Sequence, residues 1–207
     1  MKNFKEPSYP SRLKKILIAE DEEFTATELS KLLSEVGYQI VGVAKDGKEA
    51  INLALKANPD LILMDIRMPK LDGIEAAKQI NNQSHPYIPI VIITAVKEDN
   101  QIEQLRESGI LGYLMKPVFV EELVPAIETA YSRAQEFNHL RSQVINLQKE
   151  LEDRKIIERA KDILMAQRKI SGEEAMRIMR KESRNQRIRI KDFARAIVSS
   201  AGLFKNS

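Results

Sequence analysis

The stretch that decides the fold is PDLILMDIRMP, residues 59–69. Its run of leucine, isoleucine and methionine is short and bounded by prolines, which is typical of a strand buried on both faces. Asp65 comes at the carboxyl end of this predicted strand, where apolar packing gives no reason for a carboxylate. Open parallel α/β sheets bind their ligands at the carboxyl ends of the strands, so Asp65 is a candidate for chemistry. The alternative is that Asp65 only begins a turn before Pro69.

Short apolar runs alternate with helical patterns on both sides of this stretch. The other predicted strands cover residues 14–19, 38–44, 88–94 and 112–115. The predicted helices cover residues 25–36, 47–57, 72–80 and 100–108, and a further helix begins at residue 121. Five such units predict an α/β fold, a doubly wound five-stranded parallel sheet with flavodoxin-like strand order and helices on both faces.

Polar residues follow the carboxyl ends of the predicted strands, and parallel strands present these ends at one edge of a sheet. They are Glu20, Asp21, Asp65, Thr94 and Lys116. Three carboxylates crowded into a half-buried crevice need a cation, because like charges raise one another's pKa. A hard divalent ion with oxygen ligands, most simply Mg²⁺, meets that need. Lys116 and Thr94 add a positive charge and a hydroxyl donor, which suit an incoming anion.

These residues and their neighbours resemble the signature of response-regulator receiver domains. The matching motifs are Glu20-Asp21, MDIRMP at residues 64–69, Asp72-Gly73, Thr94-Ala95, Tyr113 and Lys116-Pro117. The resemblance covers about residues 13–135 and implies that Asp65 is the phosphoacceptor for a sensor histidine kinase. A degenerate receiver that never accepts phosphate is the alternative, although every chemical position of the signature is filled.

The resemblance also implies roles for the residues around Asp65. Asp21 and the backbone carbonyl of Arg67 are expected to bind Mg²⁺ beside Asp65, and Glu20 is expected to act through water. Phosphoryl transfer needs mostly positioning and charge neutralisation, which is the chemistry that such a metal site supplies.

Three further residues are implied to sense the phosphoryl group. Thr94 and Lys116 are expected to contact its oxygens, and Tyr113 is the aromatic residue expected to change rotamer. Drawing Thr94 toward the phosphoryl group would vacate space for Tyr113, which makes a two-state element biased by a local charge. The resemblance also predicts a cis peptide bond between Lys116 and Pro117, since X–Pro bonds adopt the cis form cheaply.

The helical pattern that begins at residue 121 continues far beyond the first module. Its apolar positions at three- and four-residue spacing are Leu123, Ile127, Ala130, Phe137, Leu140, Val144, Leu147 and Leu151. Such spacing over about three heptads predicts a coiled coil, and therefore a homodimer. A helix that packs this stripe against its own domain is the alternative.

The last part of the chain predicts three short helices with a high density of basic residues. Between residues 168 and 195 these are Arg168, Lys169, Arg177, Arg180, Lys181, Arg184, Arg187, Arg189, Lys191 and Arg195, against four acidic residues. Residues 139–207 carry 17 basic and 9 acidic residues, whereas residues 1–138 carry 16 basic and 21 acidic residues. The asymmetry favours a polyanionic partner for the second half, although a solvated helix face gives the same composition.

A second resemblance favours RNA as that partner. IERAKDILM at residues 157–165, Glu174-Ala175, and FARAIV at residues 193–198 are similar to ANTAR domains. The resemblance covers about residues 154–200, and the family consists of three-helix RNA-binding modules that act in transcription antitermination. Their RNA is a paired hairpin with short loops, here expected in a leader transcript.

The resemblance gives a set of candidate RNA-contact residues. They are Lys161, Arg168, Lys169, Arg177, Arg180, Lys181, Arg184, Arg187, Arg189 and Arg195. Two departures bear on the details of contact. Met176 stands where the family usually has an aromatic residue, and Ser183-Arg184 replace a usual Ala-Met pair.

The predicted organisation is a flexible tail over residues 1–13, a receiver over 14–133, a coiled-coil connector over 134–154 and an ANTAR domain over 155–207. The predicted function is a phosphorylation-controlled antiterminator, a regulatory phosphoacceptor protein and not an enzyme. One alternative is a DNA-binding response regulator with a helix-turn-helix-like output, for which no convincing recognition helix is found. Another is an output that binds protein and no nucleic acid.

Composition limits the remaining possibilities. The 207-residue chain has no cysteine, so it has neither a disulfide framework nor a thiolate metal site. No apolar stretch approaches the roughly 18 residues that span a bilayer, and residues 1–13 have no signal-peptide core. We therefore expect a cytoplasmic protein with no membrane partner.

Overall fold

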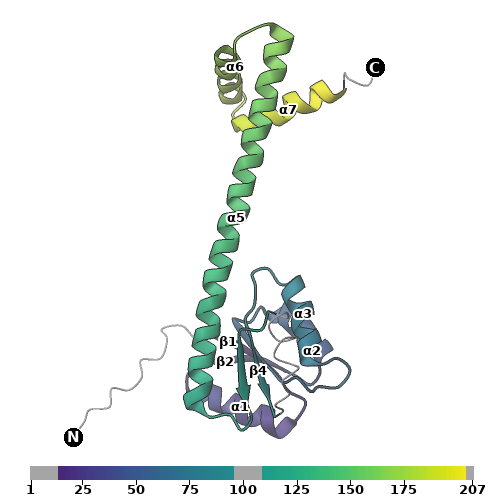
Figure 1. Ribbon diagram of the computed structural model, residues 1–207, viewed down its shortest axis with the longest axis vertical. Helices are drawn as coiled ribbons and strands as arrows, with labels where there is room; N and C mark the ends of the chain where they lie inside the picture. The colour runs from purple at the N-terminus through teal and green to yellow at the C-terminus, as the bar shows by residue number, and fades with distance from the viewer. Residues whose placement is uncertain (1–13, 96–108, 204–207) are drawn as a thin grey trace, which may run out of the picture. The chain divides into compact units, whose positions relative to one another are not determined.

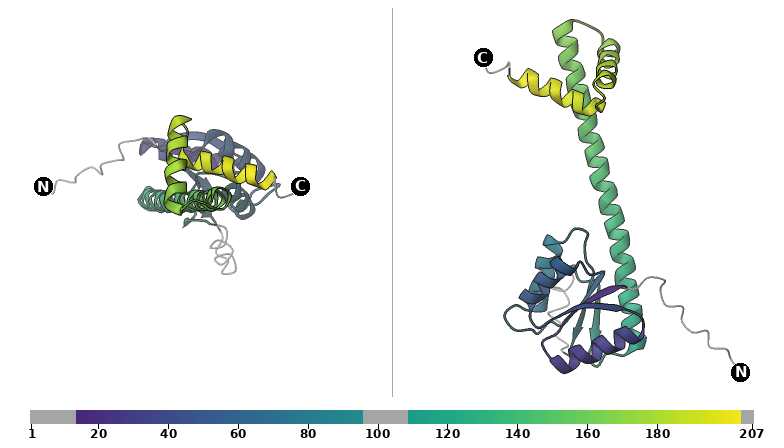
Figure 2. Two further views of the ribbon diagram at one scale, coloured as in Figure 1. Left: turned by 90° about the horizontal axis from the view of Figure 1, so that it is seen from above. Right: turned by 180° about the vertical axis from the view of Figure 1, so that it is seen from behind.

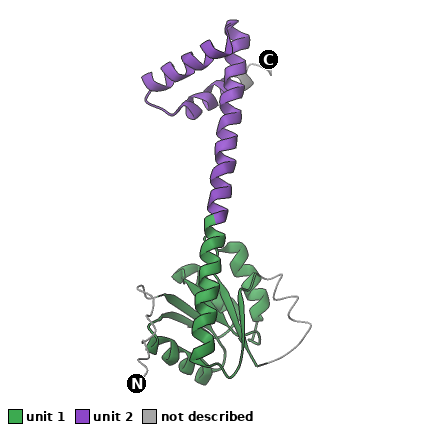
Figure 3. Cartoon of the chain, turned by 60° about the vertical axis from the view of Figure 1, so that its left-hand side comes forward, with its two compact units in different colours: residues 1–139 green, residues 140–207 purple. Residues whose placement is uncertain are grey.

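The computed structural model describes residues 14–95 and 109–203 of the chain, and side chains up to residue 200. The predicted tail at 1–13 and the predicted helix at 100–108 lie outside these residues. The chain divides into two compact units, Met1–His139 and Leu140–Ser207 (Figure 3).

The first unit contains a five-stranded parallel sheet in the order β2-β1-β3-β4-β5. Its strands are β1 Lys15–Ala19, β2 Gln39–Ala44, β3 Leu61–Met64, β4 Ile90–Thr94 and β5 Gly112–Met115. The helices are α1 Glu23–Glu35, α2 Gly47–Ala57, α3 Gly73–Gln83 and the first part of α5 Val120–Arg168. The predicted doubly wound sheet is confirmed (Figure 1).

Two hydrophobic clusters explain why the central strands are apolar on both faces. Leu17 and Ile62 point to the face covered by α2 and α3, which lie side by side in Figure 1 and Figure 2. Ile16 and Leu63 point to the opposite face and pack with residues of α1 and α5. Side chains alternate across a strand, so an uninterrupted apolar run is what a sheet covered on both faces requires.

The segment before β4 is joined to α5 by a reciprocal pair of hydrogen bonds. The backbone N–H of Tyr87 donates to Asn138 Oδ1 at 2.9 Å, and Asn138 Nδ2 donates to the Tyr87 carbonyl at 3.0 Å. The Tyr87 ring meets the Phe137 ring edge-on at 5.3 Å, and its hydroxyl donates to the carbonyl of Gly109. Burial raises the pKa of Tyr87 to about 12. This joint holds α5 at the amino end of the sheet.

The second unit contains the rest of α5 together with α6 Gly172–Asn185 and α7 Ile190–Leu203. Its core is small and consists of Ala160, Leu164, Ala175, Met179 and Ala194, with partly buried neighbours. Ser171 caps the amino end of α6, because its hydroxyl accepts a hydrogen bond from the backbone N–H of Glu174 at 3.2 Å. Within the described residues, no helix is both long and apolar enough to cross a membrane.

Candidate functional site

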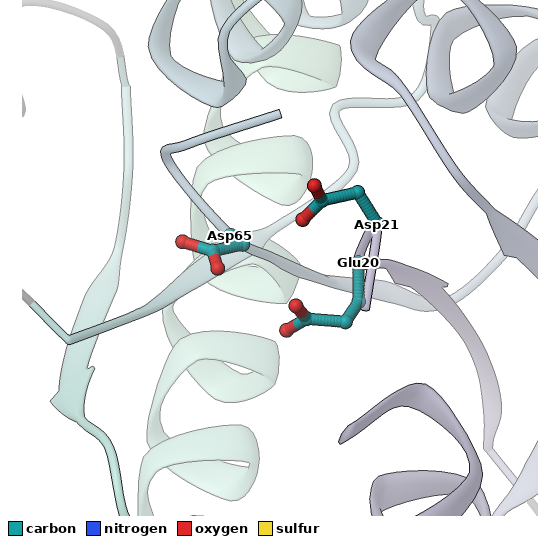
Figure 4. A group of neighbouring side chains, drawn as sticks. All are labelled: Glu20, Asp21 and Asp65. Atoms are coloured by element: carbon teal, nitrogen blue, oxygen red, sulfur yellow. The ribbon is translucent and has the colours of Figure 1, made fainter. Parts of the chain in front are cut away.

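The acidic residues predicted to converge lie together at the carboxyl edge of the sheet. Glu20 and Asp21 follow β1, and Asp65 follows β3. One carboxylate oxygen of each lies within 4.8 Å of the others, and Figure 4 shows the three side chains around one space. The parallel register brings them together, since Ala19 pairs with Met64 at the last position of both strands.

Lys116 joins two of these carboxylates. Its Nζ lies 2.6 Å from Glu20 Oε2 and 2.6 Å from Asp65 Oδ2. Glu20 is 2% exposed and Asp65 is 8% exposed. Burial raises the pKa of Glu20, even though the hydrogen bond from Lys116 opposes this. Burial alone would lower the pKa of Lys116, but its bonds to Asp65 and Glu20 outweigh that effect and raise it.

The donor set fits a hard divalent cation. Three carboxylates face one lysine, so a negative charge is left over at the site even with Lys116 in place. Asp21 is exposed, which leaves a carboxylate accessible from solvent. Oxygen ligands of this kind, with room for retained water, are those that Mg²⁺ takes in proteins. The chemistry of the residues therefore agrees with the predicted metal.

The backbone around Asp65 contributes further polar groups. The backbone N–H of Arg67 donates to Asp65 Oδ1 at 3.3 Å, and the role expected of the Arg67 carbonyl stays a prediction. The backbone N–H of Lys116 donates to the carbonyl of Thr94 at 2.9 Å, which ties the end of β4 to the residue after β5. The predicted cis bond between Lys116 and Pro117 is confirmed.

The two residues predicted to switch stand at different depths. Thr94 is buried as the last residue of β4, whereas Tyr113 of β5 is 43% exposed. Tyr113 pairs with Ile92, two positions before Thr94 along β4. The coupled movement on phosphorylation, in which Thr94 shifts toward the phosphoryl group and Tyr113 turns into the vacated space, stays a prediction.

Gly73 supports the site in a way that its sequence motif did not reveal. Its backbone N–H donates to the carbonyl of Ile66 at 2.8 Å, which folds the start of α3 against the end of β3. A Cβ atom at this position would lie 2.0 Å from the carbonyl oxygen of Asp65. The close approach of two backbone segments is a long-range property, which motif spacing alone does not show.

The predicted RNA-contact residues are divided among several parts of the second unit. Arg177, Arg180, Lys181 and Arg184 belong to α6, where they line one open hollow. Lys161 and Arg168 belong to α5, Arg195 belongs to α7, and Lys169, Arg187 and Arg189 lie between helices. The structure thus gathers four of the ten on a single helix.

Two family models match the chain in sequence order. The model of the response regulator receiver domain matches residues 16–128, and that of the ANTAR domain matches residues 146–198. Together they cover both compact units, and they agree with both resemblances in the sequence.

Several named proteins are similar to this chain. Transcriptional regulatory protein PdtaR of Mycobacterium tuberculosis is 38% identical over 194 residues, which are 94% of either chain. Response regulator GacA of Pseudomonas aeruginosa is 34% identical over 119 residues, 57% of this chain and 55% of that protein. The first similarity extends through both units.

Solved structures agree with the fold of the first unit. The signal receiver domain of a modulated diguanylate cyclase from Desulfovibrio desulfuricans has a TM-score of 0.56 and 32% identity, over 60% of this chain and 98% of that one. The response regulator domain of Thermotoga maritima CheB has a TM-score of 0.53 and 31% identity, over 58% of this chain and 98% of that one.

Proposed function

The chain belongs to the response regulators, with a receiver followed by an ANTAR domain, and on this premise we propose that Asp65 accepts a phosphoryl group from a sensor histidine kinase. The chain is a regulatory protein with an RNA-binding antitermination output, not an enzyme. The observation that carries the proposal is that Asp65 bonds to the Lys116 ammonium and shares one acidic cluster with Glu20 and Asp21.

In the proposed transfer, a carboxylate oxygen of Asp65 attacks phosphorus as the phosphorus–nitrogen bond to the donor histidine breaks. The product is an acyl phosphate, which places about −1.5 to −2 charges in the crevice. Lys116 already bonds to Asp65, so its ammonium is in place to neutralise the new oxygens. Mg²⁺ would be held by Asp21, Asp65 and the carbonyl of residue 67, with Glu20 acting through water, and would supply further charge neutralisation.

The proposed readout of this charge is a change at Thr94 and Tyr113. The Thr94 hydroxyl would turn to a phosphoryl oxygen, and the exposed Tyr113 ring would then turn inward. Support comes from the backbone bond that couples Lys116 to Thr94, because it keeps the end of β4 next to the residue that bonds to Asp65. A rotamer change driven by a local charge is a recognised switching element.

We propose the domain boundaries given by the sequence, with a coiled-coil connector over residues 134–154 that forms a homodimer. Phe137, Leu140, Val144, Leu147 and Leu151 follow one another at intervals of three, four, three and four residues along α5, and each is at least half exposed. This is the spacing of a heptad seam, whose natural occupant is the same seam of a second copy.

Replacing Leu147 with aspartate is expected to convert the dimer to a monomer in light scattering. Burying a leucine side chain contributes about 1.5–3 kcal/mol. A symmetric dimer loses two such side chains, so its dissociation constant rises roughly a hundredfold or more. Ile145→Asp is the matched control, because Ile145 is 54% exposed on the same helix but lies outside the seam. Equal molar masses for wild type and Leu147→Asp would contradict the dimer.

The experiment that tests the function joins phosphorylation to RNA capture. Acetyl phosphate with Mg²⁺ is expected to add one phosphoryl group to the wild-type chain and none to Asp65→Asn, as measured by mass spectrometry. Crosslinking and sequencing of bound RNA is then expected to enrich leader hairpins more strongly with the phosphorylated wild type. A chain that stays unmodified, or that prefers duplex DNA over hairpin RNA at matched salt, would contradict the proposal.

A further inference from the structure

We propose that the RNA backbone is bound by one face of α6, through Arg177, Arg180, Lys181 and Arg184, while the basic residues of α7 join α7 to α5. The proposal rests on the RNA-binding output of the chain and assigns the surface that performs it. It separates residues that composition alone groups into one basic cluster.

The four residues lie on one side of α6. They stand at positions i, i+3, i+4 and i+7, a spacing that places side chains on the same face of a helix. All four are exposed, and with Glu173, Met176 and Asn185 they line an open hollow of about 640 Å³. The opposite side of α6 presents Ala175, Met179 and Ser183, which are buried. The helix therefore has one face for the core and one basic face for a ligand.

The positive charge of this face is largely uncompensated. Among the described residues, Arg177 has one ion pair, an exposed contact of 3.3 Å to Glu174. Exposed pairs of this kind contribute little to stability, so a phosphate can readily replace the carboxylate. Arg180, Lys181 and Arg184 make no ion pair with any residue that the structure describes. A polyanion is the ligand class that such a face attracts.

The basic residues of α7 are bonded to acidic groups inside the unit. Lys191 Nζ and Arg195 both bind the carboxylate of Asp153 on α5, the latter at 3.0 Å. The Asp153 and Lys191 side chains are both mostly buried, and the hydrogen bond from Lys191 lowers the pKa of Asp153. Arg195 also contacts Asp192 at 3.3 Å. These cations join α7 to α5, and an RNA phosphate would have to displace their partners.

The chemistry of the α6 face suits a nucleic-acid backbone. Arginine presents a planar fork of donors that matches phosphate oxygens, and three of the four residues are arginine. Seven residues of helix rise about 10 Å, enough to reach successive phosphates of one strand. Side chains cannot read the deep major groove of paired RNA, so we assign this face to positioning on the hairpin stem.

The test measures how binding depends on salt. The probe is the RNA hairpin that the wild-type chain, treated with acetyl phosphate and Mg²⁺, enriches from a pool with a fixed stem and a randomised loop. The variant is Arg180→Gln with Arg184→Gln in the full chain. We expect roughly ten- to a hundredfold weaker binding, with the slope of log K against log salt reduced by about 0.7–0.9 for each lost contact.

Two controls distinguish binding through the α6 face from a non-specific effect of the net charge of the protein. Lys31→Gln with Lys56→Gln removes the same charge from exposed positions of α1 and α2, and is expected to leave the slope unchanged. Lys191→Gln is expected to lower the melting temperature, because Asp153 loses its closest partner. At temperatures where this variant is folded, its slope of log K against log salt is expected to equal that of the wild type. If Arg180→Gln with Arg184→Gln melts early, Arg177→Gln with Lys181→Gln replaces it.

The outcomes distinguish this inference from the function on which it rests. A wild-type chain that enriches no hairpin would refute the RNA-binding output itself. A wild type that binds, together with α6 variants of unchanged slope, would refute the α6 face alone. A fall in slope for Lys191→Gln as large as that of a single α6 substitution would place the RNA on α7 instead. If the Lys31→Gln with Lys56→Gln variant lost as much RNA affinity as the α6 variant, net charge alone would explain the effect and the α6 face would be refuted.

Discussion

Replacing Lys116 with methionine is expected to lower the melting temperature of the chain in Mg²⁺-free buffer and to make its stability strongly dependent on Mg²⁺. The ammonium bonds to Glu20 and Asp65 at 2.6 Å each, and both carboxylates are buried. Removing one partner of a buried ion pair costs about 3–5 kcal/mol. A cation that binds only the folded chain restores stability by mass action, and the variant should bind it more tightly.

The measurement is a thermal melt at increasing MgCl₂, with ionic strength held constant by NaCl. Lys48→Met is the matched control, because Lys48 is an exposed lysine of α2 outside the acidic group. The variant at residue 116 should also accept phosphoryl groups from acetyl phosphate about 10²–10³ times more slowly, the usual cost of losing one charge-stabilising donor. A rise in melting temperature with Mg²⁺ no larger than in the wild type would show that the cation does not bind among these carboxylates.

Replacing Gly73 with alanine is expected to lower the free energy of unfolding by about 3 kcal/mol or more, at the upper end of what overpacking costs. The new Cβ would lie 2.0 Å from the carbonyl oxygen of Asp65 and 3.0 Å from its carbonyl carbon. Backbone atoms cannot rotate away as a flexible side chain does, so α3 and the end of β3 must separate. Because that movement displaces Asp65, phosphorylation by acetyl phosphate should slow as well.

Gly172→Ala provides a matched control with the opposite expected sign. Both glycines are the first residue of a helix and follow a capping residue, Asp72 before α3 and Ser171 before α6. A Cβ at Gly172 meets nothing closer than 3.5 Å, the sulfur of Met165. Alanine there should therefore be neutral or stabilise the chain by up to about 1 kcal/mol, since glycine is the poorer helix former. Denaturant unfolding of both variants checks the pair, and equal changes would refute the steric explanation.

The sheet and the acidic group were predictable because local patterns determine them. Strands buried on both faces give uninterrupted apolar runs, and parallel pairing brings the residues after each run to one edge. Glu20 and Asp65 are 45 residues apart, yet the topology alone predicted their meeting. The cis bond before Pro117 came from the family resemblance, and the structure confirms it.

Contacts between residues far apart in sequence were not predictable in this way. The bonds from Asp153 to Lys191 and Arg195 join α5 to α7, and no periodicity in either helix indicates them. For that reason composition placed Arg195 in one cluster with Arg180, although the structure gives the two residues different surroundings. Helix α5 also runs unbroken from Val120 to Arg168, so the proposed boundaries at 133 and 154 correspond to no break in secondary structure.

The joint between Tyr87 and Asn138 determines which substitutions this receiver tolerates where α5 leaves the sheet. Only backbone atoms of residue 87 take part in the reciprocal pair, so many side chains there preserve it. Residue 138 must offer a donor and an acceptor on one short side chain, which an amide does and a carboxylate does not. An Asp at 138 would turn a second oxygen toward the Tyr87 carbonyl, and the resulting repulsion would loosen the helix at this point. Natural variation should therefore be narrow at position 138, whereas position 87 is restricted by its ring contact with Phe137 and its hydroxyl bond to Gly109 and not by the reciprocal pair.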